Sequence, residues 1–207
     1  ASNGGGVYIL NNSTFTMSGG EIKSNTANIA GGGVFVDNGT FTMSGTAKIT
    51  DNTAYSYGGG VFVNSGTTFT VSGTPTITGN TQGEAKKANN VHLFKNTITI
   101  GEGGLTENGG TKPQIGVTVD SQSTNVPTDG KPVDITSGAT EDLHSYFKAD
   151  DESKYQIGYN ETSKQVQLEA KPKIPLTKDN TTISITNADG FVYSGKEITP
   201  TVVVTYT

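Results

Sequence analysis

Hydrophobic and polar residues alternate along three short segments that recur through the first half of the chain. Gly-Gly-Gly-Val-Tyr-Ile at positions 4–9 returns as Gly-Gly-Gly-Val-Phe-Val at 31–36 and 58–63, which gives a period of 27 residues. Thr-Phe-Thr-Met-Ser-Gly at 14–19 returns at 40–45 and, with Val for Met, at 68–73, and a third segment around Ile22 ends in Asn-Thr in each copy. Because successive side chains of a strand point to opposite faces, we predict three strands per repeat, near 7–10, 14–18 and 21–24 in the first.

One 27-residue repeat predicts one three-sided coil of a parallel β-helix, which cannot be stable alone. Ordering the backbone costs about 1–2 kcal/mol per residue, whereas each buried side chain returns only roughly 1.5–3 kcal/mol. Stacked coils pair their backbones above and below, which explains why such units occur in arrays. Alignment of the copies, with weaker ones at 91–100 and 115–119, predicts three columns: Val7, Val34, Val61 and Val91; Phe15, Phe41, Phe69 and Ile98; and Asn25, Asn52 and Asn80 at a corner.

Turn-forming residues separate the predicted strands. The glycine triplets predict a sharp corner that needs positive φ or a close approach of two backbones. Residues 84–88 insert extra length before the fourth copy and are expected to form an exposed excursion.

Other patterns replace the repeat beyond Asp120. Thr140 as N-cap, with Leu143 and Phe147 on one face, predicts a short helix lying across the open end of the coil. Residues 155–157 and 165–168 alternate like a hairpin, and 182–185 and 201–205 like strands. We therefore expect a β-helix with its capping segment at 1–170, a stiff linker at 171–178 and an incomplete β segment at 179–207.

The repeat motifs resemble those of adhesin-like cell-surface proteins of gut bacteria. The resemblance rests on GGGV(Y/F)V, TFTMSG and the Asn-Thr-Ala that follows, and it extends through 97–119 and 146–169. It implies a right-handed parallel β-helix on a secreted, wall-attached protein, and for 179–207 the start of a small Ig-like module. Because an Ig-like sandwich needs about seven strands, and because the sequence starts at a repeat boundary without Met or signal peptide, we expect a piece of a longer chain.

Composition and charge exclude several classes of function. Charged residues make up 16%, against about 25% in typical domains, and 33 Thr and 17 Asn supply the polar surface. All 14 basic residues are scattered lysines and the net charge is −5, which argues against nucleic-acid binding. No apolar run is long enough to insert into a membrane. The absence of cysteine excludes disulfides, thiol catalysis and thiolate metal sites.

A polysaccharide-degrading lyase or hydrolase is the first alternative, because parallel β-helices host such enzymes. Glycoside hydrolysis needs two carboxylates about 5–9.5 Å apart, and the candidates are Glu21, Asp37 and Asp51. Alignment stacks Glu21 on Lys48, so we expect a weak surface ion pair there. A pectate-type lyase would typically use an arginine base, and the chain has no arginine. We therefore predict no catalytic residues.

Histidines and acidic residues give little support to a metal site. His92 and His144 are far apart in the sequence, and solvated or packed histidines explain them better. Asp150, Asp151 and Glu152 form the only acidic cluster; calcium binding there stays open beside an ordinary solvated turn. No cofactor is expected.

Outward threonine pairs form a predicted flat array: Thr14 and Thr16, Thr40 and Thr42, Thr68 and Thr70, Thr97 and Thr99. Ice-binding β-helices use such arrays, so ice binding is a third option, although threonine is also the polar residue that best suits a strand.

Aromatic residues mark the surface that we expect to bind a partner. The middle residue of the first strand of each coil is Tyr8, Phe35, Phe62 or His92, and its neighbours point inward. In-register coils place these rings about 4.8 Å apart as an exposed ladder, and exposed apolar patches often mark contacts with sugars or proteins. We predict a non-catalytic stalk or adhesin-like module on the bacterial surface, monomeric as a fragment, that binds glycan or a host or bacterial surface protein.

Overall fold

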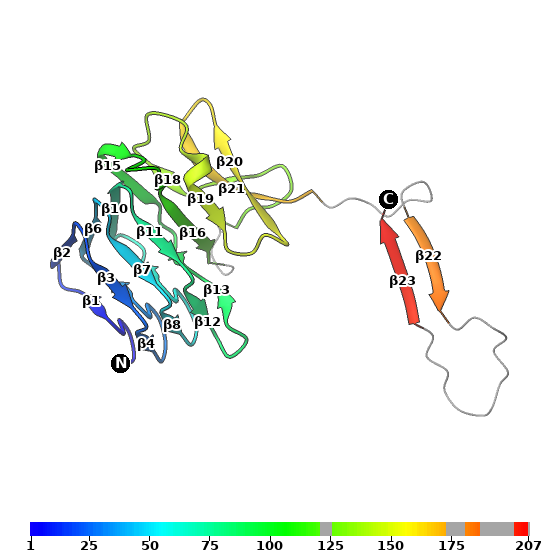
Figure 1. Ribbon diagram of the computed structural model, residues 1–207, viewed down its shortest axis with the longest axis horizontal. Helices are drawn as coiled ribbons and strands as arrows, with labels where there is room; N and C mark the ends of the chain where they lie inside the picture. Colours follow the sequence, from blue (N-terminus) through cyan, green and yellow to red (C-terminus); the bar gives the residue numbers. More distant parts are fainter. Residues whose placement is uncertain (121–125, 173–180, 187–200, 207) are drawn as a thin grey trace. The chain divides into compact units, whose positions relative to one another are not determined.

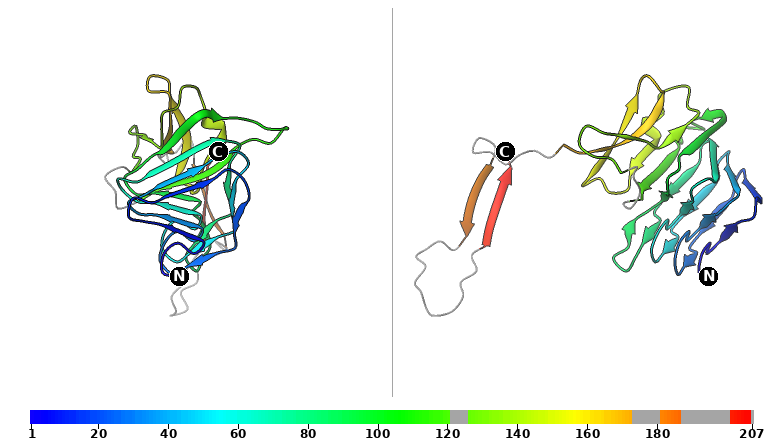
Figure 2. Two further views of the ribbon diagram at one scale, coloured as in Figure 1. Left: turned by 90° about the vertical axis from the view of Figure 1, so that its left-hand side faces the viewer. Right: turned by 180° about the vertical axis from the view of Figure 1, so that it is seen from behind.

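The computed structural model describes residues 1–120, 126–172, 181–186 and 201–206. The chain divides into two units, Ala1–Lys171 and Pro172–Thr207. The first unit is a parallel β-solenoid of about five turns, as the alternation predicts (Figure 1). Figure 2 shows the same stacked coils from two further directions.

Each of the first three coils contains four short strands. The first has β1 (Val7–Ile9), β2 (Thr14–Met17), β3 (Glu21–Lys23) and β4 (Thr26–Ala27). The second has β5 (Val34–Val36), β6 (Thr40–Met43), β7 (Lys48–Thr50) and β8 (Thr53–Ala54). The third has β9 (Val61–Val63), β10 (Thr68–Gly73), β11 (Thr76–Thr78) and β12 (Thr81–Gln82). The prediction of three strands therefore missed the fourth, two-residue strand that follows the corner asparagine.

Stacking of the coils forms four walls. The first contains β1, β5, β9 and β14 (Val91–Leu93); the second contains β2, β6, β10, β15 (Ile98–Leu105) and β18 (Thr136–Ser137). The third contains β3, β7 and β11, and the fourth contains β4, β8, β12 and β13 (Lys87–Ala88). All pairings between coils are parallel. β12 and β13 form an antiparallel hairpin, whose turn and second strand are the predicted exposed excursion at 84–88. The predicted Val and Phe columns pair in register.

The fifth turn departs from the repeat because one strand serves two walls. The first half of β16 (Gln114–Val119) pairs with β11 of the third wall, and its second half pairs with β14 of the first wall. β19 (Phe147–Ala149) then stacks on β16. In the earlier coils a corner and a strand of the fourth wall lie between the third wall and the first. In the fifth turn β16 runs directly from one of these walls to the other.

Each glycine of a corner triplet has its own physical requirement. Gly31 adopts φ +65°, and a Cβ there would lie 2.7 Å from the Cβ of Phe35. A Cβ on Gly32 would lie 2.3 Å from the carbonyl oxygen of Gly59 in the next coil, and one on Gly33 would lie 2.7 Å from that of Gly60. The predicted tight corner is confirmed: the first glycine supplies the backbone conformation and the other two allow neighbouring coils to approach.

A small antiparallel sheet, and not a helix, covers the C-terminal end of the core. It consists of β17 (Val133–Asp134), β20 (Tyr155–Asn160) and β21 (Gln165–Ala170), and Val166 and Leu168 are buried against the solenoid. The predicted helix is wrong: only a 3₁₀ turn forms, η1 (His144–Tyr146), without a side-chain cap. Phe147 instead enters β19, where pairing with β16 provides backbone hydrogen bonds that a helix would have to make internally.

The second unit contains β22 (Thr181–Thr186) and β23 (Thr201–Tyr206), paired antiparallel along their whole length. Both strands were predicted. Most of the predicted linker at 171–178 lies outside the described residues, and an Ig-like module stays a prediction.

Candidate functional site

The predicted aromatic ladder exists. Tyr8, Phe35, Phe62 and His92 occupy one register position of the first wall. The rings of Phe35 and Phe62 stack with centroids 5.0 Å apart, and those of Phe62 and His92 with centroids 5.4 Å apart. Tyr8 meets Phe35 edge to face at 5.1 Å.

The expected exposure of this ladder is wrong. Tyr8 is 45% exposed, but Phe35, Phe62 and His92 are only 8%, 9% and 3% exposed. The segment between β8 and the glycine corner folds back over the outer side of the first wall, so that Tyr57 packs against Phe62 and His92. Phe35 and Phe62 therefore form a second, smaller hydrophobic core and cannot form the centre of an open binding surface.

A second ladder, of amides, runs along the corner between the third and fourth walls. Asn25, Asn52, Asn80 and Asn90 are its asparagines, so the predicted three-member column is confirmed and one member longer. The backbone N–H and the Nδ2 of each donate to the side-chain oxygen of the next, for example from Asn52 to Asn80 Oδ1 at 3.0 and 2.9 Å. The Nδ2 groups also donate to backbone carbonyls, which satisfies polar atoms that are wholly buried at Asn52 and Asn80.

Asp150 ends this amide ladder. The backbone N–H of Asn90 donates to its Oδ2 at 2.7 Å and the Nδ2 of Asn90 to its Oδ1 at 2.5 Å, while Thr118 Oγ1 donates to Oδ2 at 2.8 Å. Gly116 makes this possible, since a Cβ there would lie 2.4 Å from Asp150 Oδ1. Burial raises the pKa of Asp150, and these hydrogen bonds lower it in part.

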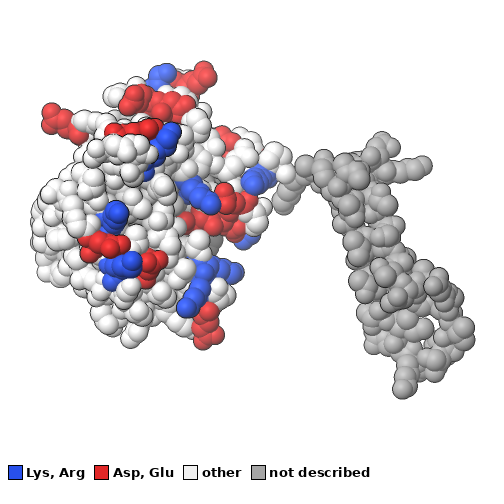
Figure 3. Space-filling model, viewed as in Figure 1, with Lys and Arg blue, Asp and Glu red and all other residues white. Residues whose placement is uncertain are grey.

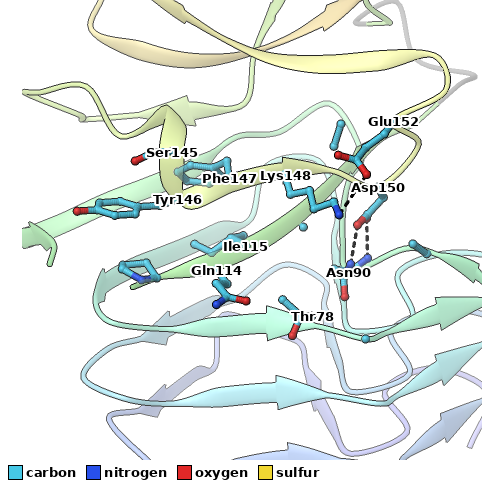
Figure 4. Close-up of a pocket in the computed structure, with 15 residues that line it drawn as sticks. Thr78, Asn90, Gln114, Ile115, Ser145, Tyr146, Phe147, Lys148, Asp150 and Glu152 are labelled. Carbon is cyan, nitrogen blue, oxygen red and sulfur yellow. Dashed lines mark hydrogen bonds and ion pairs between the residues drawn. The ribbon is translucent and has the colours of Figure 1, made fainter. Parts of the chain in front are cut away.

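Two grooves flank Asp150, where the fourth wall ends. The corner groove, shown in Figure 4, encloses about 750 Å³ between the third wall and the segment around β19. Gln114 and Thr78 line one side; Tyr146 and Lys148 line the other, and Lys148 is paired with Glu152 at 3.1 Å.

The hairpin groove lies beside the β12–β13 hairpin and encloses about 590 Å³. It shares Ala88, Asp150 and Glu152 with the corner groove. Its other lining residues include two tyrosines, an amide, two lysines and one predicted site residue: Tyr57, Tyr155, Gln82, Lys87, Lys154 and His92.

His92 is held neutral at this groove. Asn89 Nδ2 lies 3.4 Å from His92 Nδ1 and can donate to it, which assigns the proton to Nε2. Nε2 lies 3.7 Å from Asp120 Oδ2, too far for a hydrogen bond. Burial lowers the pKa of His92 to about 4, and the nearby carboxylate opposes the shift through its charge.

Most charges around the hairpin groove are already paired. Asp151 accepts from Ser153 and pairs with Lys154 at 3.1 Å, and Glu152 pairs with Lys148. Lys87 is exposed and makes no ion pair within the part of the chain that the structure describes. Figure 3 shows charged residues of both signs gathered in small groups, with wide uncharged areas between them.

The other sequence candidates do not meet at one site. Glu21 accepts from Thr50 at 2.6 Å; its nearest lysine is Lys23 at 3.9 Å rather than the predicted Lys48, and Lys23 also lies 3.4 Å from Asp51. Asp37 accepts from Asn64 in the next coil.

Among the described residues there is no group of three or more His, Asp or Glu side chains that could hold a metal ion. Asp150 points to Asn90, whereas Asp151 and Glu152 are paired with different lysines. His144 is exposed and lies 2.7 Å from Asp142.

Comparison of the chain with protein-family models, with curated proteins and with solved structures gives no match. The described part of the chain contains no helix that is both long and apolar enough to cross a membrane.

Proposed function

We propose that the chain is a non-catalytic module of a bacterial cell-surface protein that binds glycans in the hairpin groove. The observation that carries the proposal is the lining of this groove, where two phenol rings, an amide and the ammonium group of Lys87, which makes no ion pair with any described residue, border one space. Ligand pockets characteristically combine such apolar surfaces with a few placed polar groups, and about 590 Å³ lies within their usual size range.

The chemistry of these groups suits a sugar that bears a carboxylate. Tyrosine rings present a negative face, which attracts the polarised C–H bonds on the apolar side of a pyranose. Gln82 and the tyrosine hydroxyls can exchange hydrogen bonds with sugar hydroxyls. Because the three acidic side chains are engaged in internal bonds, Lys87 is the charged group most free to pair with a ligand.

The scaffold also favours a display role. The solenoid fixes every coil on its neighbours by backbone pairing and by the amide ladder, so a groove between coils is held by rigid elements. The repeat motifs resemble those of adhesin-like surface proteins, which supports an extracellular location on the cell surface or wall, and an Ig-like segment at 179–207 would fit the same setting.

A polysaccharide-degrading enzyme is the alternative. Glu21 and Asp51 both approach Lys23 beside the third wall, but neither lines one of the two grooves. Turnover of any polysaccharide that is lost on replacing either carboxylate would favour the enzyme over the binding module.

Ice binding is favoured by one further observation. Thr14, Thr40 and Thr68 pair in register on the second wall, as do Thr16, Thr42, Thr70 and Thr99. The hydroxyls thus form a regular array, with spacings of about 4.8 Å between coils and about 6.6 Å along a strand. Thermal hysteresis that disappears in Thr42→Lys would support this function, and freezing at the buffer's own temperature would reject it.

The glycan proposal is tested by titrating the full chain with acidic and neutral oligosaccharides in a calorimeter. We expect Lys87→Ala to weaken binding of an acidic oligosaccharide about tenfold, or ~1.4 kcal/mol, and added salt to weaken wild-type binding. Lys48→Ala is the matched control, because Lys48 is also an exposed lysine but lies on the third wall, away from the groove. Equal affinities of the two variants, or absence of binding by the wild type, would refute the site.

A further inference from the structure

Tyr55 is the most exposed large hydrophobic residue among those the structure describes, at 64%. It follows β8 directly, at the outer edge of the fourth wall. The backbone pairing that continues beyond β4 and β8 aligns it with Asn28 one coil earlier and with Gly83 one coil later. Since Gly83 has no side chain, the tyrosine ring has no neighbour at its own position on that side.

A groove of about 450 Å³ lies beside this ring. Ala27 and Ala54 lie at its base but are buried, and Gly83 has no side chain, so the ring of Tyr55 supplies most of the exposed apolar surface. The tyrosine groove, as we call it, is therefore shallow and apolar around a phenol ring, on a wall whose strands are paired in register.

Polar groups surround this apolar surface. Thr26 and Thr53 occupy paired positions on β4 and β8, and Thr53 Oγ1 lies 3.2 Å from Thr81 Oγ1 in a line of hydroxyls. Asn28 and Glu84 also line the groove, and no lysine of the described part of the chain does. The hydroxyls and the amide both donate and accept hydrogen bonds, as sugar hydroxyls do.

We propose that the tyrosine groove binds an uncharged sugar ring, with the apolar face of the sugar on Tyr55 and its hydroxyls on Thr26, Thr53 and Asn28. Among the described residues Glu84 is the only charged side chain that lines the groove, so an anionic sugar would be repelled there. An apolar peptide side chain would cover the ring but leave the hydroxyls and the amide without the partners that a sugar supplies.

This site is separate from the hairpin groove. The two grooves share no lining residue: Gly83 and Glu84 of the β12–β13 segment line one, and Gln82 and Lys87 line the other. The tyrosine groove is proposed for neutral sugars and the hairpin groove for acidic ones, so either proposal can fail while the other stands.

The chain contains no tryptophan, which allows a direct optical test. Tyr55→Trp in the full chain introduces a single indole into the proposed site, and Tyr8→Trp introduces one at another exposed tyrosine as the matched control. Titration with neutral methyl glycosides and disaccharides, which cannot bridge two sites, is expected to change the emission of the Tyr55→Trp variant saturably and to leave that of the Tyr8→Trp variant unchanged.

Affinity measurements on the native residue complete the test. By ligand-observed NMR of the full chain with a neutral disaccharide, Tyr55→Ala should lose binding at least tenfold, and Tyr55→Phe should keep it within about twofold because the ring remains. Lys87→Ala should have no effect on this ligand. The proposal is overturned if Tyr55→Ala binds like the wild type, if Tyr55→Phe loses binding as Tyr55→Ala does, or if no neutral sugar binds. Far-UV circular dichroism establishes that each variant is folded.

Discussion

Replacing Asn52 by aspartate tests how much the amide ladder contributes to stability. Asn52 is fully buried, and its Nδ2 donates to Asn80 Oδ1, to the Ile22 carbonyl and to the Thr50 carbonyl, each at 2.9 Å. Aspartate keeps the acceptor that Asn25 needs, but it replaces the donor by a negatively charged oxygen that faces these three oxygens.

The magnitude follows from the bonds that are lost. The two N–H groups of the amide contribute about 1 kcal/mol each, and leaving their buried acceptors without a donor costs a further ~1–3 kcal/mol. Loss of one partner from a buried charged arrangement costs about 3–5 kcal/mol, and here the new charge has no cation beside it. We therefore expect Asn52→Ala to lose about 3–5 kcal/mol at pH 7 and Asn52→Asp to lose more than about 5 kcal/mol.

The two variants should also differ in their response to pH. Burial without a cation raises the pKa of the new carboxyl above its unfolded value near 3.9, so the folded variant binds a proton more tightly than the unfolded chain. The stability of Asn52→Asp relative to wild type should therefore rise as the pH falls toward 4, whereas that of Asn52→Ala should not.

The assay is equilibrium unfolding of the full chain in urea, followed by circular dichroism and by tyrosine fluorescence between pH 4.5 and 7.5. The slope of the transition relates the midpoint shift to free energy, and coincident curves from the two signals establish a single transition. Asn25→Asp, at the half-buried first member of the ladder, is the matched control and should cost less. If Asn52→Asp is no less stable than Asn52→Ala at pH 7, or if its relative stability is independent of pH, the ladder does not act as described.

Two further results are expected in the same assay. His92 has a folded pKa of about 4 against 6.5 in the unfolded chain, so the unfolded state binds the proton more tightly. About 3 kcal/mol of stability, fully present above pH 6.5, should therefore be lost as the pH falls from 6.5 to 4. His92→Phe, which can keep the stack on Phe62, should remove this loss. Gly32→Ala would place a Cβ 2.3 Å from Gly59 O and should cost more than ~3 kcal/mol or prevent folding. Gly19→Ala, where a Cβ would meet no atom within 4 Å, should change stability by less than ~0.5 kcal/mol. Similar losses in both glycine variants would contradict the steric account of the corner.

The repeat made most of the solenoid predictable, because the 27-residue period determines which residues of neighbouring coils pair, and the alternation determines which side chains point into the core. The columns at Val7, Phe15 and Asn25 follow from alignment alone. The fourth strand was not predictable in this way: Thr26–Ala27 is too short for alternation to be visible, and its strand character comes from pairing with the next coil. That omission also explains why Phe62 was expected on the surface, since Tyr57, in the segment after the fourth strand, packs against it.

The site depended on contacts that no local pattern contains. Asp150 lies 60 residues from Asn90 in the sequence and stands outside the repeat, so its place at the end of the amide ladder appears only in three dimensions. Its membership of an acidic run suggested a solvated turn or a calcium ligand instead. Tyr55 gave a signal in the sequence only as an aromatic residue in a turn, and its exposure depends on the missing side chain of Gly83.

The amide ladder has a direction, and this gives the solenoid a defined stopping point. Each of the four asparagines donates hydrogen bonds from its N–H groups to the next member, and Asn52, Asn80 and Asn90 also accept them on the side-chain oxygen. One more coil with asparagine at this position would therefore continue the series without altering the others. A carboxylate receives but cannot pass on, as Asp150 does. Exchange of one NH₂ group for an oxygen thus separates a coil that propagates the array from a coil that terminates it. The solenoid can therefore change in length by whole repeats as long as the terminating residue stays last.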